Sequence, residues 1–327
     1  MRLATFNIES LDLGPDVAVP FEARAAVLRP LLERLAADIL CLQEVNGQHV
    51  AGAPERRLVA LEKLLQGTRY ETYSRAATTG PSGVGVASVH NLVTLARYPI
   101  LDRREVRHQH VRPPLHAFVT GIAKDGDPQP IAFDRALLVV EVETPDGNRL
   151  NVINLHLRAP RASPVAGEKL DSTTWRTTGG WAEGYFLSSV KRTAQALELR
   201  LVVDEMLGRD PECLIAVAGD FNAEDRETPL RLAVAEETQT GNQALACQSL
   251  VVLDRHIPAG RRWSVLHRGR PQMLDHILAS RALWRRFRGI EVHNQGLSDE
   301  APASAEATGV VGSLHAPVVA EFDFGCP

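Results

Sequence analysis

Leu214-Ile215-Ala216-Val217-Ala218-Gly219-Asp220-Phe221-Asn222 is a short apolar run that stops at a glycine and then presents an acid and an amide two positions apart. Its length and its β-branched residues predict a buried strand rather than a helix. Because strand side chains alternate in direction, Asp220 and Asn222 leave the strand end on the same side. In an α/β fold such strand ends reach the ligand crevice. Asp and Asn are equally common in an Asx turn that closes a strand, and this stretch alone leaves both interpretations open.

Segments of the same kind recur along the chain and alternate with helical patterns. Short apolar or alternating runs predict strands, and apolar residues three and four apart predict helices. Pro30 either kinks the first helix or marks its start, and Asp146-Gly147 predicts a hairpin turn. With no repeat and no linker, the pattern predicts a single domain over residues 1–327, with sheets packed between helices. The predicted strands are 3–8, 38–45, 86–95, 136–144, 150–157, 214–218, 273–278 and 318–322, and the helices 27–35, 56–66 and 186–207.

The composition excludes some classes of protein. Of the 327 residues, 44% are hydrophobic and 23% charged, as in a globular protein with a substantial core. A net charge of -4 argues against a broad basic face that coats nucleic acid, so contact with DNA or RNA would need a local basic patch. Residues 103–116 are such a segment, although a solvated loop explains them equally well.

The chain shows no targeting or membrane-spanning pattern. The apolar run at its start is too short for a signal peptide, and no segment reaches the length that spans a bilayer. Its four cysteines have no CxxC spacing and are expected to be free thiols in a reducing compartment. We therefore expect a cytoplasmic location.

Polar residues gather at the predicted strand ends. Carboxylates among them offer oxygen ligands for a hard divalent cation. A histidine oriented by an aspartate makes a general base, and amides with a further histidine can stabilise a charged oxygen. Together these groups suit hydrolysis of a phosphate ester. The set consists of Asn7, Glu9, Glu44, His156, Asp220, Asn222, Asp275 and His315.

The order and spacing of these motifs resemble the endonuclease/exonuclease/phosphatase superfamily, which includes DNase I and the exonuclease III-type AP endonucleases. The resemblance covers nearly the whole chain and implies an α/β fold: a two-sheet, four-layer sandwich of mixed β-sheets with helices on the outside. The matching motifs are Thr5-Phe6-Asn7-Ile8-Glu9, Leu42-Gln43-Glu44-Val45, Arg97-Tyr98-Pro99-Ile100, Asn154-Leu155-His156, Gly219-Asp220-Phe221-Asn222, Leu274-Asp275-His276-Ile277-Leu278 and Ser313-Leu314-His315.

The resemblance also implies which residues hold the cation and the substrate. Glu44 would be the principal ligand of Mg²⁺ or Mn²⁺, and Glu9 would contribute, directly or through water. Asn7 and Asn222 would hold the site geometry and the phosphate oxygens. Arg135 occupies a place where DNase-like relatives use a phosphate-contacting arginine.

Four further residues would handle protons and charge. Asp275 would orient His315, and His315 would take the proton from the attacking water. Asp220 would assist the nucleophile or handle protons at the phosphate. His156 would stabilise the pentacoordinate transition state.

One position departs from the family pattern. Where the family usually carries Ser-Asp-His, this chain has Ser313-Leu314-His315, and leucine can hold neither a metal ion nor its waters. We expect weaker Mg²⁺ binding unless Asp299 or Glu300 substitutes for the missing acid.

Three functions follow as hypotheses. The first is a Mg²⁺-dependent phosphodiesterase that acts on nucleic acid. The second is the same chemistry on a small phosphate ester, such as a nucleotide, a sugar or inositol phosphate, or a phospholipid head group. The third, motivated by Leu314, is a phosphate-binding protein that has lost activity. Substrate choice is expected to lie in the loops 103–134 and 158–184, where Trp175 and Trp181 either wall the pocket or anchor the chain.

Overall fold

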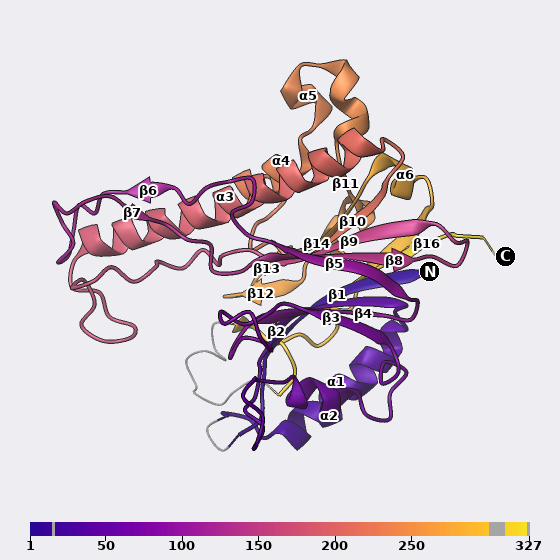
Figure 1. Cartoon of the computed structure of the whole chain (residues 1–327), viewed down its shortest axis with the longest axis horizontal. Helices are drawn as coiled ribbons and strands as arrows, with labels where there is room; N and C mark the ends of the chain where they lie inside the picture. Colours follow the sequence, from indigo (N-terminus) through magenta and orange to yellow (C-terminus); the bar gives the residue numbers. More distant parts are fainter. Residues whose placement is uncertain (15–16, 301–310, 326–327) are drawn as a thin grey trace.

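Two six-stranded sheets face each other in the computed structural model, which describes residues 1–14, 17–300 and 311–325 (Figure 1). The first sheet has the order β15-β16-β1-β2-β4-β3. Within it β1 runs parallel to β2 and all other neighbours are antiparallel. Its strands are β1 (Arg2–Leu11), β2 (Ile39–Val45), β3 (Ser74–Ala77), β4 (Asn91–Ala96), β15 (Phe287–Val292) and β16 (Val318–Phe322).

The second sheet repeats this arrangement with the order β11-β14-β10-β9-β8-β5. Here β9 and β10 form the one parallel pair, and the other neighbours are antiparallel. Both sheets are therefore mixed, as expected. The strands are β5 (Ile100–Val106), β8 (Leu137–Glu143), β9 (Arg149–His156), β10 (Leu214–Asp220), β11 (Val251–Val252) and β14 (Asp275–Ala279).

Helices cover the outer face of each sheet, as Figure 1 shows. On the first sheet lie α1 (Phe21–Leu35) and α2 (Val59–Leu65). The second sheet is covered by α3 (Thr178–Arg209) and α4 (Thr228–Val234), with α6 (Arg281–Trp284) near its edge. The result is the α/β four-layer sandwich that the sequence predicts.

Strand periodicity explains why three hydrophobic layers form. In β10, Ala216 and Ala218 face the other sheet, whereas Ile215 and Val217 face α3. A third apolar layer joins the first sheet to α1 and α2. Because the central strands are buried on both faces, they read as continuous apolar runs in the sequence.

Smaller elements close the ends of the sandwich. A hairpin of β12 (Val265–His267) and β13 (Arg270–Gln272) lies beside the open edge where the two sheets meet. The remaining pieces are α5 (Glu237–Thr240) and three 3₁₀ turns at Gln243–Gln248, Leu253–His256 and Ala259–Arg261. No helix in the described ranges is long and apolar enough to span a membrane.

Three predicted element starts are wrong, those of α3, of β4 and of α1, which begins at Phe21 rather than at residue 27. Helix α3 begins at Thr178, eight residues before the predicted start, because Thr177 caps it by accepting a hydrogen bond from the Gly180 amide at 2.9 Å. Its early glycines suggested a loop, but a Cβ on Gly180 would lie 2.3 Å from Glu168. Strand β4 begins at Asn91 rather than at residue 86. Pro30 lies inside α1 and does not mark its start.

The N-terminal part of α3 projects from the sandwich as an arm, beside β6 (Leu115–His116) and β7 (Gln129–Pro130) (Figure 1). Buried Glu183 of α3 fastens the arm. Its carboxylate accepts hydrogen bonds from the amides of Val119 and Thr120 at 2.8 and 2.9 Å and contacts His116 at 2.8 Å. Trp175 packs against a small apolar cluster of this arm, and Trp181 stacks on Tyr185. Neither tryptophan lines the cavity described below.

Candidate active site

The polar residues predicted at the strand ends meet at one edge of the sandwich. Strands β1 and β2 of the first sheet end beside β9 and β10 of the second, and β14, which runs antiparallel to β10, begins there. The edge opens into a cavity of about 580 Å³. Seven of the nine predicted site residues line it: Glu9, Glu44, Arg135, His156, Asp220, Asn222 and His315. Asn7 and Asp275 lie directly behind them, each hydrogen-bonded to a lining residue.

A histidine stands between two carboxylates at the floor of the cavity. The Nδ1 of His315 lies 2.8 Å from Asp275 Oδ2, and its Nε2 lies 3.9 Å from Asp220 Oδ2. Both aspartates are buried. The Asp275 contact fixes the ring, so that Nε2 is the nitrogen presented towards Asp220 and the cavity.

The end of the stretch 214–222 forms an Asx turn and also contributes side chains to the cavity. The amide of Asn222 donates to Asp220 Oδ1 at 2.8 Å, which is the Asx turn. The other oxygen, Oδ2, accepts from the amide groups of Asn222 and Asn7 at 3.2 and 3.1 Å and lies 3.3 Å from His156 Nε2. The two interpretations of this stretch are therefore compatible, because the turn positions the carboxylate.

Gly219 is required by the strand pairing behind this turn. A Cβ at this position would lie 2.0 Å from the carbonyl oxygen of Leu155 on β9. Asn222 then adopts a left-handed backbone with φ 48°, and the guanidinium of buried Arg192 donates to its carbonyl oxygen. The side-chain amide of Asn222 also donates to the Leu157 carbonyl at 3.1 Å. These contacts hold Asn222 firmly at the cavity wall.

Glu44 faces the cavity from the end of β2. Its Oε1 accepts from Asn7 Nδ2 at 3.3 Å, and its Oε2 accepts from Ser10 Oγ at 3.2 Å. His90 Nδ1 lies 3.6 Å from Oε2, and His156 Nε2 lies 3.8 Å from Oε1. Like Asn222, Glu44 has a left-handed backbone, with φ 60°. Such conformations are uncommon outside glycine and concentrate at functional sites.

Glu9 is attached to the segment that departs from the family pattern. Its Oε2 accepts a hydrogen bond from the backbone amide of Leu314 at 2.7 Å. The hydroxyl of Ser313 donates to the Asn7 carbonyl at 2.7 Å and accepts from the His315 amide at 3.0 Å. Leu314 thus positions Glu9 through its backbone, while its buried side chain supplies no ligand.

The two acids considered as substitutes lie in different places. Asp299 accepts hydrogen bonds from the backbone amides of Arg268 and Gly269 in the turn of the β12–β13 hairpin. Glu300 lines the cavity, where it pairs with Arg161 at 2.6 Å and His267 at 2.9 Å. The sequence also predicts an exposed loop over residues 297–309, of which residues 301–309 lie outside the described residues.

Burial and neighbouring charges shift several pKa values. Burial, reinforced by nearby Asp275, raises the pKa of Asp220 to about 7. Burial alone would lower the pKa of His315, but the carboxylates of Asp275 and Asp220 raise it to about 10. For His156 burial dominates, and with the positive charge of Arg135 it holds the pKa well below its ordinary value. These shifts favour the charged form of His315, the neutral form of His156 and the protonated form of Asp220 up to a higher pH than usual.

The pKa values of Glu9 and Glu44 are shifted in opposite directions. Burial raises the pKa of Glu9. Burial also acts on Glu44, but neighbouring His90 and the hydrogen bond from Asn7 hold its pKa below the ordinary value. Glu44 is accordingly the more readily ionised of the two.

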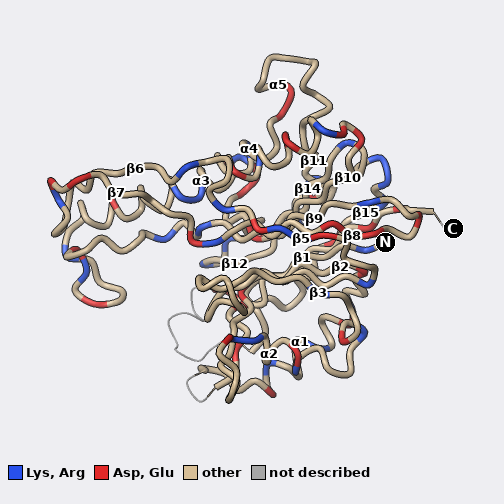
Figure 2. The backbone as a smooth tube through the Cα atoms, viewed as in Figure 1, with Lys and Arg blue, Asp and Glu red and all other residues tan. Residues whose placement is uncertain are grey.

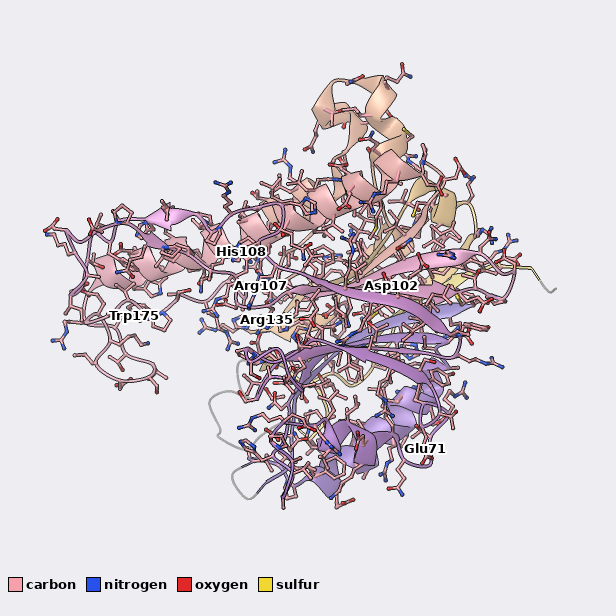
Figure 3. All side chains as sticks on the ribbon, viewed as in Figure 1. Glu71, Asp102, Arg107, His108, Arg135 and Trp175 are labelled. Carbon is pink, nitrogen blue, oxygen red and sulfur yellow. The ribbon has the colours of Figure 1, made fainter. Side chains whose placement is uncertain are left out.

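Three arginines line the cavity: Arg135, Arg158 and Arg161. Arg135 lies at the base of the arm (Figure 3), and burial lowers the pKa of its guanidinium. The sequence predicts only this one. Arg158 and Arg161 lie on the loop that follows β9 and carry no motif of their own. His90 and Ser10 also line the cavity and carry no motif signal.

The basic segment 103–116 is bound largely by acids of α3. The carboxylate of Glu198 accepts hydrogen bonds from the backbone amides of Gln109, His110 and Val111 at 2.6 to 3.2 Å. The carboxylate of Glu205 lies 3.8 Å from the Arg104 guanidinium. Exposed Arg107 remains on its surface. In the view of Figure 2 basic and acidic stretches are interspersed along the arm.

The residues at this edge fit a divalent cation. Glu44 and Glu9 supply the oxygen ligands that Mg²⁺ and Mn²⁺ take. A second arrangement is offered by Asp220, Asp275 and His315, whose ligand atoms lie within 4.8 Å of one another. In this second arrangement the short Asp275–His315 contact already occupies one ligand atom of each of these two residues.

Comparison with known proteins supports the fold and the family. The sequence model of the Endonuclease/Exonuclease/phosphatase family matches residues 4–299. No curated protein matches the chain.

Several solved structures share the fold at low identity. The 3′ phosphatase NExo from Neisseria, bound to a product DNA hairpin, is 19% identical with a TM-score of 0.54, over 99% of this chain and 100% of that one. An AP endonuclease from Archaeoglobus fulgidus is 18% identical (TM-score 0.51, 99% of both chains). The mannosyl-6-phosphatase Bt3783 from Bacteroides thetaiotaomicron is 13% identical (TM-score 0.57, 99% and 100%). The fold is thus shared by proteins described as a DNA-bound 3′ phosphatase, an AP endonuclease and a mannosyl-6-phosphatase.

Proposed function

Because the chain belongs to the Endonuclease/Exonuclease/phosphatase family, we propose that it is a divalent-metal-dependent hydrolase of phosphate esters, with a nuclease-like phosphodiesterase activity. The observation that carries the proposal is the Asp275–His315–Asp220 arrangement beside Glu44 in one cavity. Buried acid–base groups with displaced pKa values in a cleft are typical of catalytic sites.

Substrate binding is assigned to the arginines that line the cavity. Arg135 and Arg158 face the same cavity as Glu44 and can donate hydrogen bonds to non-bridging phosphate oxygens. Mg²⁺ or Mn²⁺ held by Glu44 and Glu9 would supply charge neutralisation at the phosphate. These residues orient the phosphorus towards the floor of the cavity, where the proton-handling groups lie.

Proton transfer is assigned to Asp220. With a pKa of about 7, its buried carboxylate can take a proton from the attacking water as the new P–O bond forms and the bond to the leaving oxygen breaks. The cationic imidazole of His315, oriented by Asp275, then stabilises the negative charge of the pentacoordinate state. This assignment differs from the sequence-based expectation, which made His315 the base. The reason is that two carboxylates hold its proton.

His156 and the asparagines complete the centre. His156, kept neutral, can donate from Nε2 to a phosphoryl oxygen, since this atom faces Asp220 and Glu44 at the cavity wall. Asn7 holds both of those carboxylates through one amide group, which fixes their separation.

The second candidate, a phosphatase of small phosphate esters, is favoured by Arg161. This exposed side chain lines the cavity and could bind a further anionic group of a compact substrate.

An activity panel separates these possibilities. Purified protein is assayed with Mg²⁺ or Mn²⁺ on DNA, RNA, bis-p-nitrophenyl phosphate and a sugar phosphate. Asp220→Asn and His315→Ala are each expected to lower kcat by about 10²–10⁴-fold, whereas His49→Ala, outside the site, keeps wild-type activity. Full activity in either site variant contradicts the mechanism. Absence of hydrolysis on every substrate by folded, metal-loaded protein favours a phosphate-binding role.

A further inference from the structure

His90 occupies a position that the motifs do not explain. It precedes β4 and has a left-handed backbone with φ 58°. Its amide donates to Asn46 Oδ1 at 3.0 Å, and the side chain of Asn91 accepts from the Ala87 amide at 2.7 Å. The bend that carries His90 is therefore fixed by hydrogen bonds on both sides.

The imidazole of His90 is aimed at Glu44. Its Nδ1 is buried and has no hydrogen-bond partner among the described residues. The nearest carboxylate oxygen is Glu44 Oε2, at 3.6 Å, which is longer than a hydrogen bond. A buried, unpartnered ring nitrogen beside a carboxylate at this distance calls for a third group between the two atoms.

The separation suits two ligands of one cation. Two atoms each about 2.1 Å from a metal ion lie about 3.0 Å apart in octahedral and about 3.4 Å apart in tetrahedral coordination. The observed 3.6 Å is close to the second value. Ser10 Oγ, 3.2 Å from the same carboxylate oxygen, lies on this side as well.

We propose that the His90 imidazole is a ligand of the divalent cation held by Glu44, so that the site prefers a first-row transition-metal ion to Mg²⁺. The inference rests on the proposed metal-dependent function and specifies its cation. Imidazole nitrogen suits transition metals, whereas Mg²⁺ takes oxygen ligands. Leu314, with no oxygen in its side chain, leaves the coordination sphere short of the ligand that His90 supplies.

Mn²⁺ titration of the full chain tests this assignment without an activity measurement. Free Mn²⁺ is followed by electron paramagnetic resonance, and electron spin-echo modulation reports a ¹⁴N nucleus bound to the ion. His90→Gly is the informative variant, because glycine accepts the left-handed backbone at this position without strain. His267→Gln, which removes another imidazole of the same cavity, is the control.

We expect the wild type and His267→Gln to bind Mn²⁺ at least about tenfold more tightly than Mg²⁺ and to show ¹⁴N modulation. His90→Gly should lose the modulation and at least about tenfold in Mn²⁺ affinity. Modulation and affinity that persist in His90→Gly overturn the assignment of His90. If the wild type binds Mn²⁺ but shows no ¹⁴N modulation, the assignment of His90 is also overturned, while the proposed function stays intact. Failure of the wild type to bind either cation contradicts both.

Discussion

Single side chains decide the protonation of the centre. Replacing Asp275 by Asn removes the carboxylate that raises the His315 pKa, so burial should dominate and the pKa should fall from about 10. Activity should drop by about 10²–10⁴-fold, since the ring loses both its charge and its orientation. Titration of the histidine signals by NMR measures the shift. Asp134→Asn is the control, and a His315 pKa that stays at its wild-type value in Asp275→Asn contradicts the account.

Leu314 permits a direct test of metal affinity. Leu314→Asp adds a carboxylate beside Glu9, so Mg²⁺ should bind more tightly than in the wild type, by about tenfold. Isothermal titration calorimetry with Mg²⁺ measures the change. Equal Mg²⁺ affinity in the two proteins would refute the expectation that the departure at this position weakens the site.

Sequence motifs predict some of the candidate site residues and miss others. Asp220 and Glu44 lie at the ends of strands whose apolar runs are plain, His315 comes just before such a strand, and the structure brings the three together at one edge. His90 and Arg158 were missed because they lie outside the regular strands, before β4 and after β9, and only the folded chain brings them to the cavity. Local sequence patterns do not identify residues that reach the cavity only through the tertiary structure.

The pairing of strands β9 and β10 positions most of the side chains at the floor of the cavity. Gly219→Ala would place a methyl group 2.0 Å from the Leu155 carbonyl and force the two strands apart. We expect a loss of about 1–3 kcal/mol in the free energy of unfolding, measured by urea denaturation. Gly208→Ala, in α3 with no atom near its Cβ, should instead stabilise by about 0.5–1 kcal/mol. Equal effects of the two substitutions contradict this reading.

Element boundaries were predicted less well than element types. Strands β1, β2, β9 and β10 lie where apolar runs predict them, because both faces are buried. The predicted start of α3 was wrong, since Gly179 and Gly180 are poor helix formers, and at Gly180 the glycine is required by the close approach of Glu168. Tertiary packing overrides local propensity there.

For the molecule as a whole, a buried ion pair makes stability depend on pH. Asp254 contacts His276 Nδ1 at 2.8 Å and Arg262 at 2.6 Å. Burial opposes ionisation of both partners, but each holds the other charged: the Asp254 pKa is lowered and the His276 pKa raised. The aspartate's contribution is present above its unfolded pKa of about 4 and is lost as the pH falls through the lower folded value. The histidine's contribution is complete below about pH 6.5 and is lost as the pH rises through the higher folded value.

Stability should therefore be greatest between about pH 4 and 6.5 as far as this pair is concerned. Urea denaturation at pH 3, 5.5 and 9 measures it. Asp254→Asn should cost about 3–5 kcal/mol near pH 5.5, because it leaves buried charge uncompensated. A variant whose stability follows the same pH profile as the wild type contradicts the role of the pair.

The left-handed backbone at Glu9, Glu44 and Asn222 has a consequence for protein engineering. Each of these residues combines a conformation that favours glycine with a side chain that glycine lacks. A graft of this centre onto another scaffold must therefore reproduce three specific chain reversals as well as the side chains. Substitutions that optimise backbone propensity at these positions would remove the side chains on which the proposed activity depends, so stabilising substitutions should be made elsewhere in the two sheets.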